Sequence, residues 1–129
     1  MTHPNVDRLN QGYDAFEKGD LDTIRQLFTE DIVFHVPGRS PLAGDYRGQD
    51  EVFGFFGKLV ELTGGTFKIE RHAVLADDAH GAVLTTVTGS RDGKTLSQNA
   101  VDIFHFAGDR VKECWALDSD QYAGDEFFS

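Results

Sequence analysis

The chain has little of what marks a secreted or membrane-bound protein. It contains a single cysteine, Cys114, so an internal disulfide is excluded and a reducing compartment is expected. Its apolar runs extend over only a few residues, far short of a membrane span, and residues 1–8 lack the basic-then-apolar pattern of a signal peptide. These absences predict a cytoplasmic protein that makes no contact with a membrane.

Basic residues are also scarce. The chain carries 12 lysines and arginines against 22 aspartates and glutamates, which gives a formal net charge of −10. A surface of this sign repels nucleic-acid phosphates and anionic lipids, so neither is expected as a partner.

Motifs for metals and nucleotides are missing as well. The five histidines are scattered without His-x-His spacing, and one cysteine cannot form a Cys-x-x-Cys pair, so no metal site is predicted. No glycine-rich phosphate loop or nucleophile elbow occurs, which leaves nucleotide cofactors and serine hydrolysis without support. Any reaction is therefore expected to need no cofactor.

The elements that are present predict one α+β domain over residues 1–129, which is long enough for a single core. Apolar residues recur at helical spacing in the first half, and runs rich in Val, Thr, Phe and Ile fill the second half. The pattern predicts helices at 4–18, 21–28 and 50–60, a strand at 31–36 followed by a turn-rich loop at 37–48, and an antiparallel meander of strands at 66–76, 80–90, 94–107 and 110–118.

The strand at 94–107 indicates the shape of the sheet. Its 14 residues would span about 46 Å if straight, which is long for a domain of this size, so the strand must bend. A bent and twisted sheet has a concave face, and the three predicted helices can close it. The sequence therefore predicts a pocket between the sheet and the helices.

Four short stretches resemble a known superfamily. Residues 11–22 read QGYDAFEKGDLD and residues 27–31 read LFTED; residues 100–106 read AVDIFHF and residues 110–115 read RVKECW. The first two are similar to the opening, and the last two to the final hairpin, of ketosteroid isomerases and SnoaL-like polyketide cyclases in the nuclear transport factor 2-like superfamily. The resemblance implies a cone-shaped half-barrel sheet around a pocket, but it leaves the reaction open, because this fold hosts isomerases, cyclases, dehydratases, epoxide hydrolases and non-catalytic binders.

The resemblance also implies roles for two residues. Tyr13 falls where the isomerases keep an oxyanion-binding tyrosine, and Asp102 falls where they keep a protonated aspartic acid that donates a second hydrogen bond. The general base of the isomerases would stand at Val36, before Pro37, so we do not predict a ketosteroid isomerase. The epoxide hydrolases need an arginine at Ala100, which disfavours that activity too.

Physical chemistry singles out Asp102 independently. It lies in the middle of an apolar strand, where a buried carboxylate must either find a partner or keep its proton. The alternative is a structural or solvent-facing acid at a sheet edge, and for Tyr13 the alternative is an ordinary core aromatic. If the two side chains converge in the pocket, they can polarise a carbonyl group.

The register of the last hairpin decides where Asp118 points. A three-residue turn at 107–109 places Asp102 opposite Cys114 and turns Asp118 toward the pocket, whereas a two-residue turn at 108–109 places Trp115 opposite Asp102 and turns Asp118 away. The usual loop of the family favours the first register. Asp118 is then the best candidate for a carboxylate base.

His35 adjoins the position of the missing base. Strict alternation points it away from the pocket, but a bend near Pro37 could turn it inward, where a neutral imidazole suits proton transfer. Further residues are expected to contact the ligand, namely Val36, Phe53, Phe56, Phe104, Cys114 and Trp115.

Apolar side chains occur on both faces of the strand at 94–107: Phe104 and Phe106 lie on one side, and Val101 and Ile103 on the other. A sheet with two apolar faces needs cover on both, so we predict a homodimer. Three functions follow in order of preference: a proton-transfer enzyme (isomerase, cyclase or dehydratase) acting on an apolar carbonyl or polycyclic compound, a non-catalytic binder of small molecules, and a dimeric interaction module.

Overall fold

The first two helices begin at the predicted residues, 4 and 21, and the second ends one residue before its predicted end at 28. The computed structural model describes residues 3–129 and shows α1 at Pro4–Lys18, with a proline in its first turn and Gly19 as its C-cap at φ 70°. The Asp20 side chain accepts a hydrogen bond from the Thr23 amide and so caps α2 at Leu21–Leu27. These caps separate the two helices by a tight corner, as the sequence predicts.

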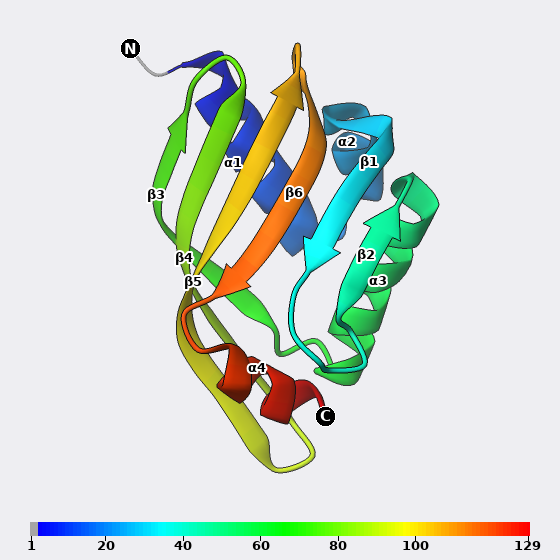
Figure 1. Ribbon diagram of the computed structural model, residues 1–129, viewed down its shortest axis with the longest axis vertical. Coiled ribbons are helices and arrows are strands. Elements are labelled where there is room, and N and C mark those ends of the chain that lie inside the picture. Colours follow the sequence, from blue (N-terminus) through cyan, green and yellow to red (C-terminus); the bar gives the residue numbers. More distant parts are fainter. Residues whose placement is uncertain (1–2) are drawn as a thin grey trace.

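The strands form one six-stranded sheet in the order β2-β1-β6-β5-β4-β3 (Figure 1). Neighbouring strands are antiparallel except for β1 and β6, which are parallel, so the prediction of a wholly antiparallel sheet was wrong at that pair. The remaining elements are β1 at Phe28–Val36, β2 at Gly44–Arg47, α3 at Gln49–Leu62, β3 at Lys68–Ala76, β4 at His80–Arg91, β5 at Lys94–Ala107, β6 at Arg110–Asp118 and α4 at Gln121–Phe128.

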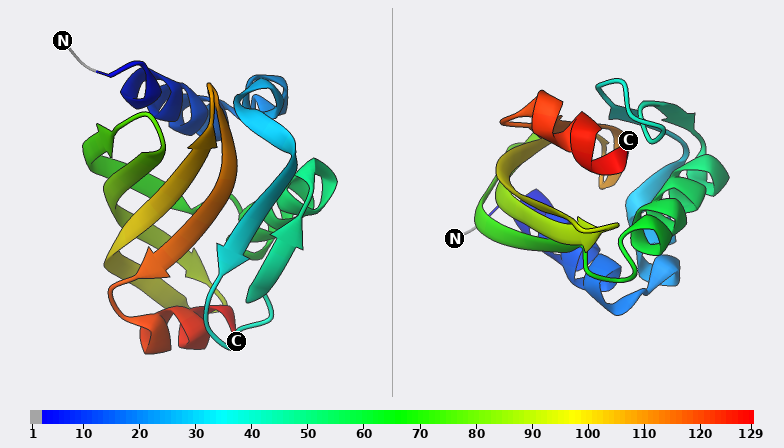
Figure 2. Two further views of the ribbon diagram at one scale, coloured as in Figure 1. Left: turned by 45° about the horizontal axis from the view of Figure 1, so that its top comes forward. Right: turned by 90° about the horizontal axis from the view of Figure 1, so that it is seen from below.

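The sheet is curved and its concave face is covered by helices, which confirms the predicted α+β cone. Figure 2 shows the long strands β4 and β5 curling around, with α1 and α3 on the inner side and α4 across one end. None of the helices within residues 3–129 is long and apolar enough to cross a membrane.

Two elements differ from the prediction. The loop at 37–48 contains the short strand β2, which pairs with β1, and a fourth helix, α4, follows the meander. Asp120 caps α4 by accepting from the Ala123 amide, and Phe127 anchors it with 2% of its surface exposed. Short elements of this kind depend on packing more than on periodicity, which explains why the sequence pattern did not reveal them.

The core lies between the concave face and the helices and is rich in phenylalanine. Phe34 of β1 contacts Phe55 and Phe56 of α3 with ring centroids 5.5 and 5.7 Å apart. Phe16 of α1 meets Phe56 edge-on at 5.2 Å. These rings form one wall of the cavity that is described next.

Candidate functional site

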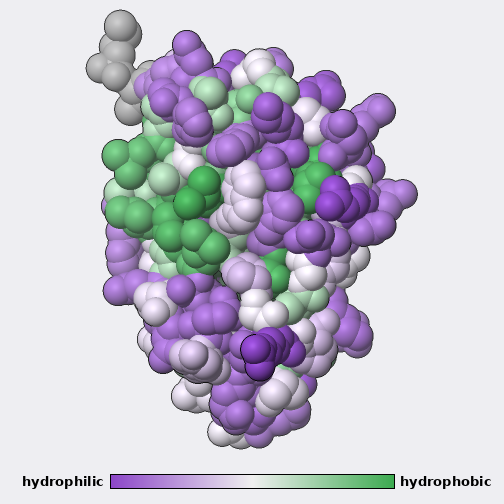
Figure 3. Space-filling view, viewed as in Figure 1, coloured by the Kyte–Doolittle hydropathy of each residue, from purple (hydrophilic) through white to green (hydrophobic). Residues whose placement is uncertain are grey.

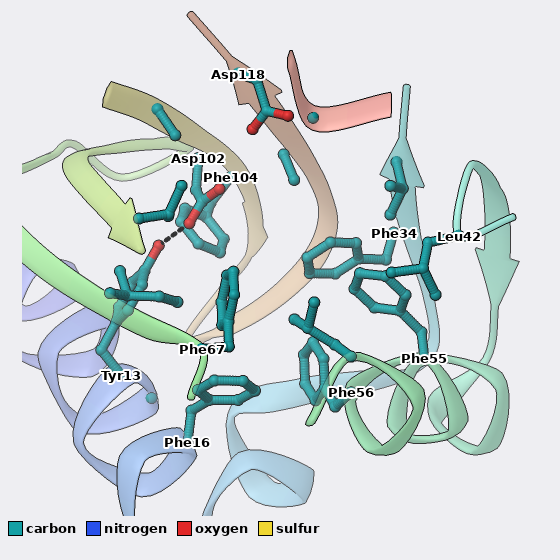
Figure 4. A pocket seen from close by; sticks show the side chains of 18 of the residues that line it. Tyr13, Phe16, Phe34, Leu42, Phe55, Phe56, Phe67, Asp102, Phe104 and Asp118 are labelled. Atoms are coloured by element: carbon teal, nitrogen blue, oxygen red, sulfur yellow. Dashed lines mark hydrogen bonds between the residues drawn. The ribbon is translucent and has the colours of Figure 1, made fainter. Parts of the chain in front are cut away.

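A cavity of about 180 Å³ lies between the concave face, α1, α3 and α4. Its wall is mostly aromatic and aliphatic (Figure 4), and its polar side chains come from α1, which contributes Arg8 and Tyr13, from Ser40 in the loop after β1, from the last two strands and from α4. The side chains drawn and labelled there are Tyr13, Phe16, Phe34, Leu42, Phe55, Phe56, Phe67, Asp102, Phe104 and Asp118. The cavity has the lining expected of a site for a small, largely apolar molecule, and its volume is close to the roughly 150 Å³ that holds one benzene ring.

Tyr13 and Asp102 meet inside this cavity. The Tyr13 hydroxyl of α1 donates a hydrogen bond to Oδ2 of Asp102 on β5, and both residues line the cavity. They are brought together because α1 packs across the concave face at the level where β5 carries its acid. The aromatic ring of Tyr13 also meets Phe104 edge-on, which fixes its orientation.

The surroundings of Asp102 favour its protonated form. The pKa of its carboxyl is raised to about 6. Enclosure by protein is the largest cause, the hydrogen bond from Tyr13 works in the opposite direction, and the negative charge of Asp118 adds to the rise. Burial and the neighbouring Asp102 likewise raise the pKa of Tyr13 well above its ordinary value. The pair therefore holds its protons more tightly than the same groups in water.

Asp118 also faces the cavity, by a route that differs from both predicted registers. The hairpin uses the two-residue turn, since Ala107 pairs with Arg110, but a bulge at Lys112 adds one residue to β6. Asp102 consequently lies opposite Ala116, and Ala100 lies opposite Asp118. The prediction of a three-residue turn with Asp102 opposite Cys114 was wrong.

Asp118 has no hydrogen-bonding partner within residues 3–129 and lies beneath α4. Burial, followed by the negative charges of Asp125 and Asp120, raises the pKa of its carboxyl. On the ladder it is the diagonal neighbour of Asp102, a relation that puts such Cβ atoms up to about 7–8 Å apart. Asp102 and Asp118 thus share one cavity in different surroundings, and of these two carboxyl groups only that of Asp102 bonds to a tyrosine.

Three of the six predicted wall residues line the cavity, namely Val36, Phe56 and Phe104. The other three do not. Phe53 is buried behind the wall, stacked on Phe28 and under the guanidinium of Arg25. Cys114 is completely covered by its neighbours, and Trp115 points to the convex face of the sheet, because the bulge sets the alternation of β6.

His35 lies on the convex face as well, so its predicted catalytic place in the pocket was wrong. Its Nδ1 is 2.7 Å from Oδ1 of Asp45 and its Nε2 is 2.6 Å from Oε2 of Glu113. Burial alone would lower the pKa of His35, but these two carboxylates together raise it. The ring stacks on Trp115, and the group ties β2, β1 and β6 together.

Some residues near the site were missed. Gln121, Gly124 and Asp125 of α4 line the cavity, and Asp125 accepts a hydrogen bond from the Arg39 amide, joining α4 to the loop after β1. Arg71 lies 5.6 Å from the centre of the Tyr13 ring and bonds to Asp14. The sequence signal that could have revealed α4 was Asp120, a residue type that often caps the start of a helix, followed by the aromatic pair Phe127 and Phe128.

The convex face carries an apolar patch made of two cross-strand rows. One row joins Leu75, Ala82, Ile103 and Trp115, and the other joins Ala73, Leu84, Val101 and Leu117. We call these eight residues the convex patch; none of them is charged, and Leu75 and Leu84 expose 55% and 42% of their surfaces. Figure 3 shows apolar residues gathered over β3, β4 and β5 on this face.

Comparisons with known proteins agree with this architecture. Residues 9–114 match the family described as the SnoaL-like domain. The chain is 38% identical to Bal32a from a soil-derived mobile gene cassette, with a TM-score of 0.94 over 98% of this chain and 97% of that one. It is 29% identical to an uncharacterized protein of Mycobacterium tuberculosis over 97% of this chain and 96% of the relative. An NTF2-like protein from Burkholderia pseudomallei has the same fold, with a TM-score of 0.88, 17% identity and 99% of both chains covered.

Proposed function

Because the chain belongs to the SnoaL-like domain family, we propose that it is a cofactor-independent enzyme that moves a proton on a small, neutral carbonyl compound. The observation that carries this proposal is the hydrogen bond between Tyr13 and Asp102 inside an apolar cavity. Two acidic hydrogen-bond donors in such surroundings stabilise negative charge on an oxygen far better than water does. Isomerisation, cyclisation and dehydration all need this kind of stabilisation.

In the proposed reaction the substrate's carbonyl oxygen takes the place of Asp102 as the acceptor for the Tyr13 hydroxyl, and the protonated carboxyl of Asp102 donates a second hydrogen bond to the same oxygen. Asp118 removes a proton from a carbon next to the carbonyl, and the electron pair of that C–H bond moves onto the oxygen. The proton then returns from Asp118 to another atom of the substrate. Asp118 suits this role because its raised pKa brings its basicity closer to neutral pH, where proton transfer is most efficient.

A non-catalytic binder is the second candidate, and Val36 is the observation that favours it. This side chain lines the cavity where the resemblance to the isomerases leads one to expect a base. A protein that lost its base could keep the pocket and bind the same compounds. The third candidate, an interaction module, requires a shallow or filled pocket, and the open cavity speaks against it.

A homodimer through the convex patch is part of the proposal. Two copies of a chain with a net charge of −10 repel each other wherever their charged surfaces meet, and the convex patch offers a contact area without charge. Stable interfaces place apolar groups like these at the centre and polar groups around them. His35, Glu113 and His105 lie directly beside the patch and would form that rim.

The reaction can be tested without knowing the natural substrate. Incubation with 1-tetralone in D₂O, followed by ¹H NMR, measures exchange of the hydrogens next to the carbonyl. We expect exchange above the buffer rate, and Asp118→Asn should slow it about 10²–10⁴-fold, the usual contribution of a general base. The exposed Asp109→Asn in the same hairpin is the matched control and should change the rate less than two-fold, about the level of a change that leaves the site intact.

The pH dependence sharpens this test. Catalysis needs the protonated form of Asp102, so exchange should decline as pH rises through about 6, the pKa of that carboxyl. Asp102→Asn, whose amide donates a hydrogen bond at every pH, should remove the decline while lowering the maximal rate. Exchange at the buffer rate under all these conditions would contradict catalysis and favour the binder.

A further inference from the structure

Arg71 of β3 lies beside Tyr13, on the side away from Asp102. Its guanidinium carbon stands over the face of the Tyr13 ring, 5.6 Å from the ring centre. The side chain exposes only 22% of its surface, so water screens its charge less than that of a surface arginine. A positive charge therefore lies against the residue whose hydroxyl is proposed to bind the substrate's oxygen.

A bulge in β3 directs this side chain toward α1. Arg71 pairs with Thr85, whereas Ala73 pairs with Leu84, so His72 is an extra residue in the strand. In regular alternation Arg71 and Ala73 would share one face, and Ala73 belongs to the convex patch. The bulge reverses the alternation and places Arg71 on the concave face with its buried partner Thr85. Bulges that redirect one side chain in this way are over-represented next to active sites.

Arg71 also binds α1 at successive turns around Tyr13. Its Nη1 donates to the carbonyl oxygen of Asn10 at 3.2 Å and to Oδ1 of Asn10 at 2.9 Å. Its Nη2 donates to Oδ1 of Asp14 at 2.6 Å and lies 3.7 Å from Oε1 of Glu17. These three residues follow one another at helical spacing, so they hold the guanidinium in one orientation and the Tyr13 ring is fixed from its outer side.

The carboxylates of Asp14 and Glu17 do not cancel the effect of Arg71 on Tyr13. Both side chains are more than half exposed, so water screens their charges strongly. Burial and the neighbouring Asp102 raise the pKa of Tyr13, and the charge of Arg71 acts in the opposite direction. The guanidinium thus favours negative charge on the Tyr13 hydroxyl.

This contact becomes stronger as the proposed reaction proceeds. When the electron pair of the C–H bond moves onto the substrate's oxygen, part of the negative charge reaches Tyr13 through its hydrogen bond to that oxygen. A ring that gains electron density attracts a cation over its face more strongly. An interaction that strengthens only as charge develops lowers the barrier without tightening the binding of the neutral ketone.

We propose that Arg71 is a positioning residue of this site, which holds the Tyr13 ring from outside the cavity and stabilises the negative charge that reaches the tyrosine hydroxyl as the substrate reacts. Arg71 does not line the cavity, so it acts through Tyr13 and has no contact with the ketone. This inference rests on the proposed function, because the charge develops only if a proton is removed from the substrate.

Exchange kinetics with 1-tetralone in D₂O test this role, since initial rates at several ketone concentrations give kcat and KM. We expect Arg71→Met, which keeps an unbranched side chain without its charge, to lower kcat about ten-fold and to change KM less than about two-fold. Arg71→Lys, which restores a cation without the planar fork, should recover kcat to within about three-fold of the wild type. The exposed Arg110→Met in β6 is the matched control and should leave both constants unchanged.

Asp14→Asn separates the charge of Arg71 from its attachment to α1. The variant removes the ion pair but keeps an amide oxygen that accepts the same hydrogen bond. The guanidinium then stays over the ring with less opposing charge, so kcat should equal that of the wild type or exceed it up to about two-fold. If Arg71 served only to attach α1 to the sheet, Asp14→Asn would lower kcat as Arg71→Met does, and Arg71→Lys would not restore it. Urea unfolding shows that each variant is folded.

The ionisation of a bound phenol gives a readout that needs no turnover. 3,4-Dinitrophenol offers an oxygen to the Tyr13 hydroxyl, and its visible absorbance measures the ionised fraction in the complex. Since the stabilised group is again a negatively charged oxygen, Arg71→Met should lower the ionisation constant of the bound phenol about ten-fold, and Arg71→Lys should restore most of it.

The outcomes separate this inference from the proposed function. Exchange in the wild type with an unchanged kcat in Arg71→Met, or an equal loss in Arg71→Met, Arg71→Lys and Asp14→Asn, would overturn the role of Arg71 while the catalytic proposal stands. An unchanged ionisation constant of the bound phenol in Arg71→Met would overturn the stabilisation of charge. Exchange at the buffer rate in the wild type would overturn the proposed function and the part of Arg71 in it.

Discussion

The carboxylates on the two faces of the sheet differ in their partners. On the convex face Glu113 and Asp45 both bond to His35, and these two hydrogen bonds favour the charged imidazolium between them. On the concave face Asp118 has no partner within residues 3–129, and Asp102 has only the neutral hydroxyl of Tyr13. A carboxylate that is paired contributes to stability, whereas one kept unpaired in an apolar cavity costs stability and gains a raised pKa.

The largest expected effect is the dissociation of the proposed dimer by a charge introduced on the convex face. Leu84→Glu places a charge in the centre of the convex patch, opposite Val101, so each dimer would bury two unpaired carboxylates. We expect the dimer to dissociate at least 100-fold more readily, about 3 kcal/mol. Sedimentation velocity of the wild type and the variant measures this. Val60→Glu on α3, also exposed, is the control; a monomeric wild type at micromolar concentration would contradict the dimer.

The next effect concerns the concave face and is a gain in stability. The pKa of the Asp102 carboxyl is higher in the folded protein, at about 6, than in the unfolded chain. At pH values between these two pKa values folding takes up a proton, so the free energy of unfolding falls as pH rises through this range to about 6. A difference of about two pKa units corresponds to roughly 3 kcal/mol at pH 8. Asp102→Asn removes this cost, and urea unfolding at pH 8 should show the variant to be more stable by about 2 kcal/mol, with little difference at pH 3. Equal stability at pH 8 would show that the carboxyl is well solvated.

The smallest effect has the opposite sign and belongs to the convex face. The pKa of His35 is raised on folding, so its stabilising contribution is complete below about 6.5 and is lost as pH rises through the folded value. Replacement by Gln, which keeps hydrogen-bonding ability but no charge, should cost about 1 kcal/mol at pH 5.5 and less at pH 9. Thermal unfolding at the two pH values measures the change. If the loss of stability in the variant grew with pH, it would contradict a stabilising positive charge on His35 between Asp45 and Glu113.

Some parts of this site could be predicted from the sequence and others could not. The helical spacing of Leu9, Tyr13 and Phe16 and the long strand with Asp102 are strong local signals, and they are enough to predict α1, the meander and a concave face. The positions of Trp115 and Asp118 depend on a bulge at Lys112, which the hydrophobic pattern does not encode. The predicted turn was too long by one residue and the bulge adds one residue, so the two differences offset each other for the face on which Asp118 lies.

The residues beneath α4 show a second limit. Gln98 is one polar residue among several along β5, and only the helix that follows the sheet gives it a buried neighbourhood. Gly124 likewise has no distinguishing neighbours in the sequence, although its Cα hydrogen is what leaves room for the carboxylate of Asp118. The surroundings of such residues depend on the contact between two segments that are distant in the sequence, so the local sequence pattern does not predict them.

The bulge in β6 also determines how this hairpin can change in length during evolution. Deletion of Lys112 straightens the strand yet leaves Glu113 opposite His105, so every residue after it keeps its side of the sheet. Loss of a single residue between Cys114 and Asp118 would instead move Asp118 to the convex face and remove its carboxylate from the cavity. We therefore expect changes in length near the tip of the hairpin to leave Asp118 in the cavity, and changes a few residues further along to remove it.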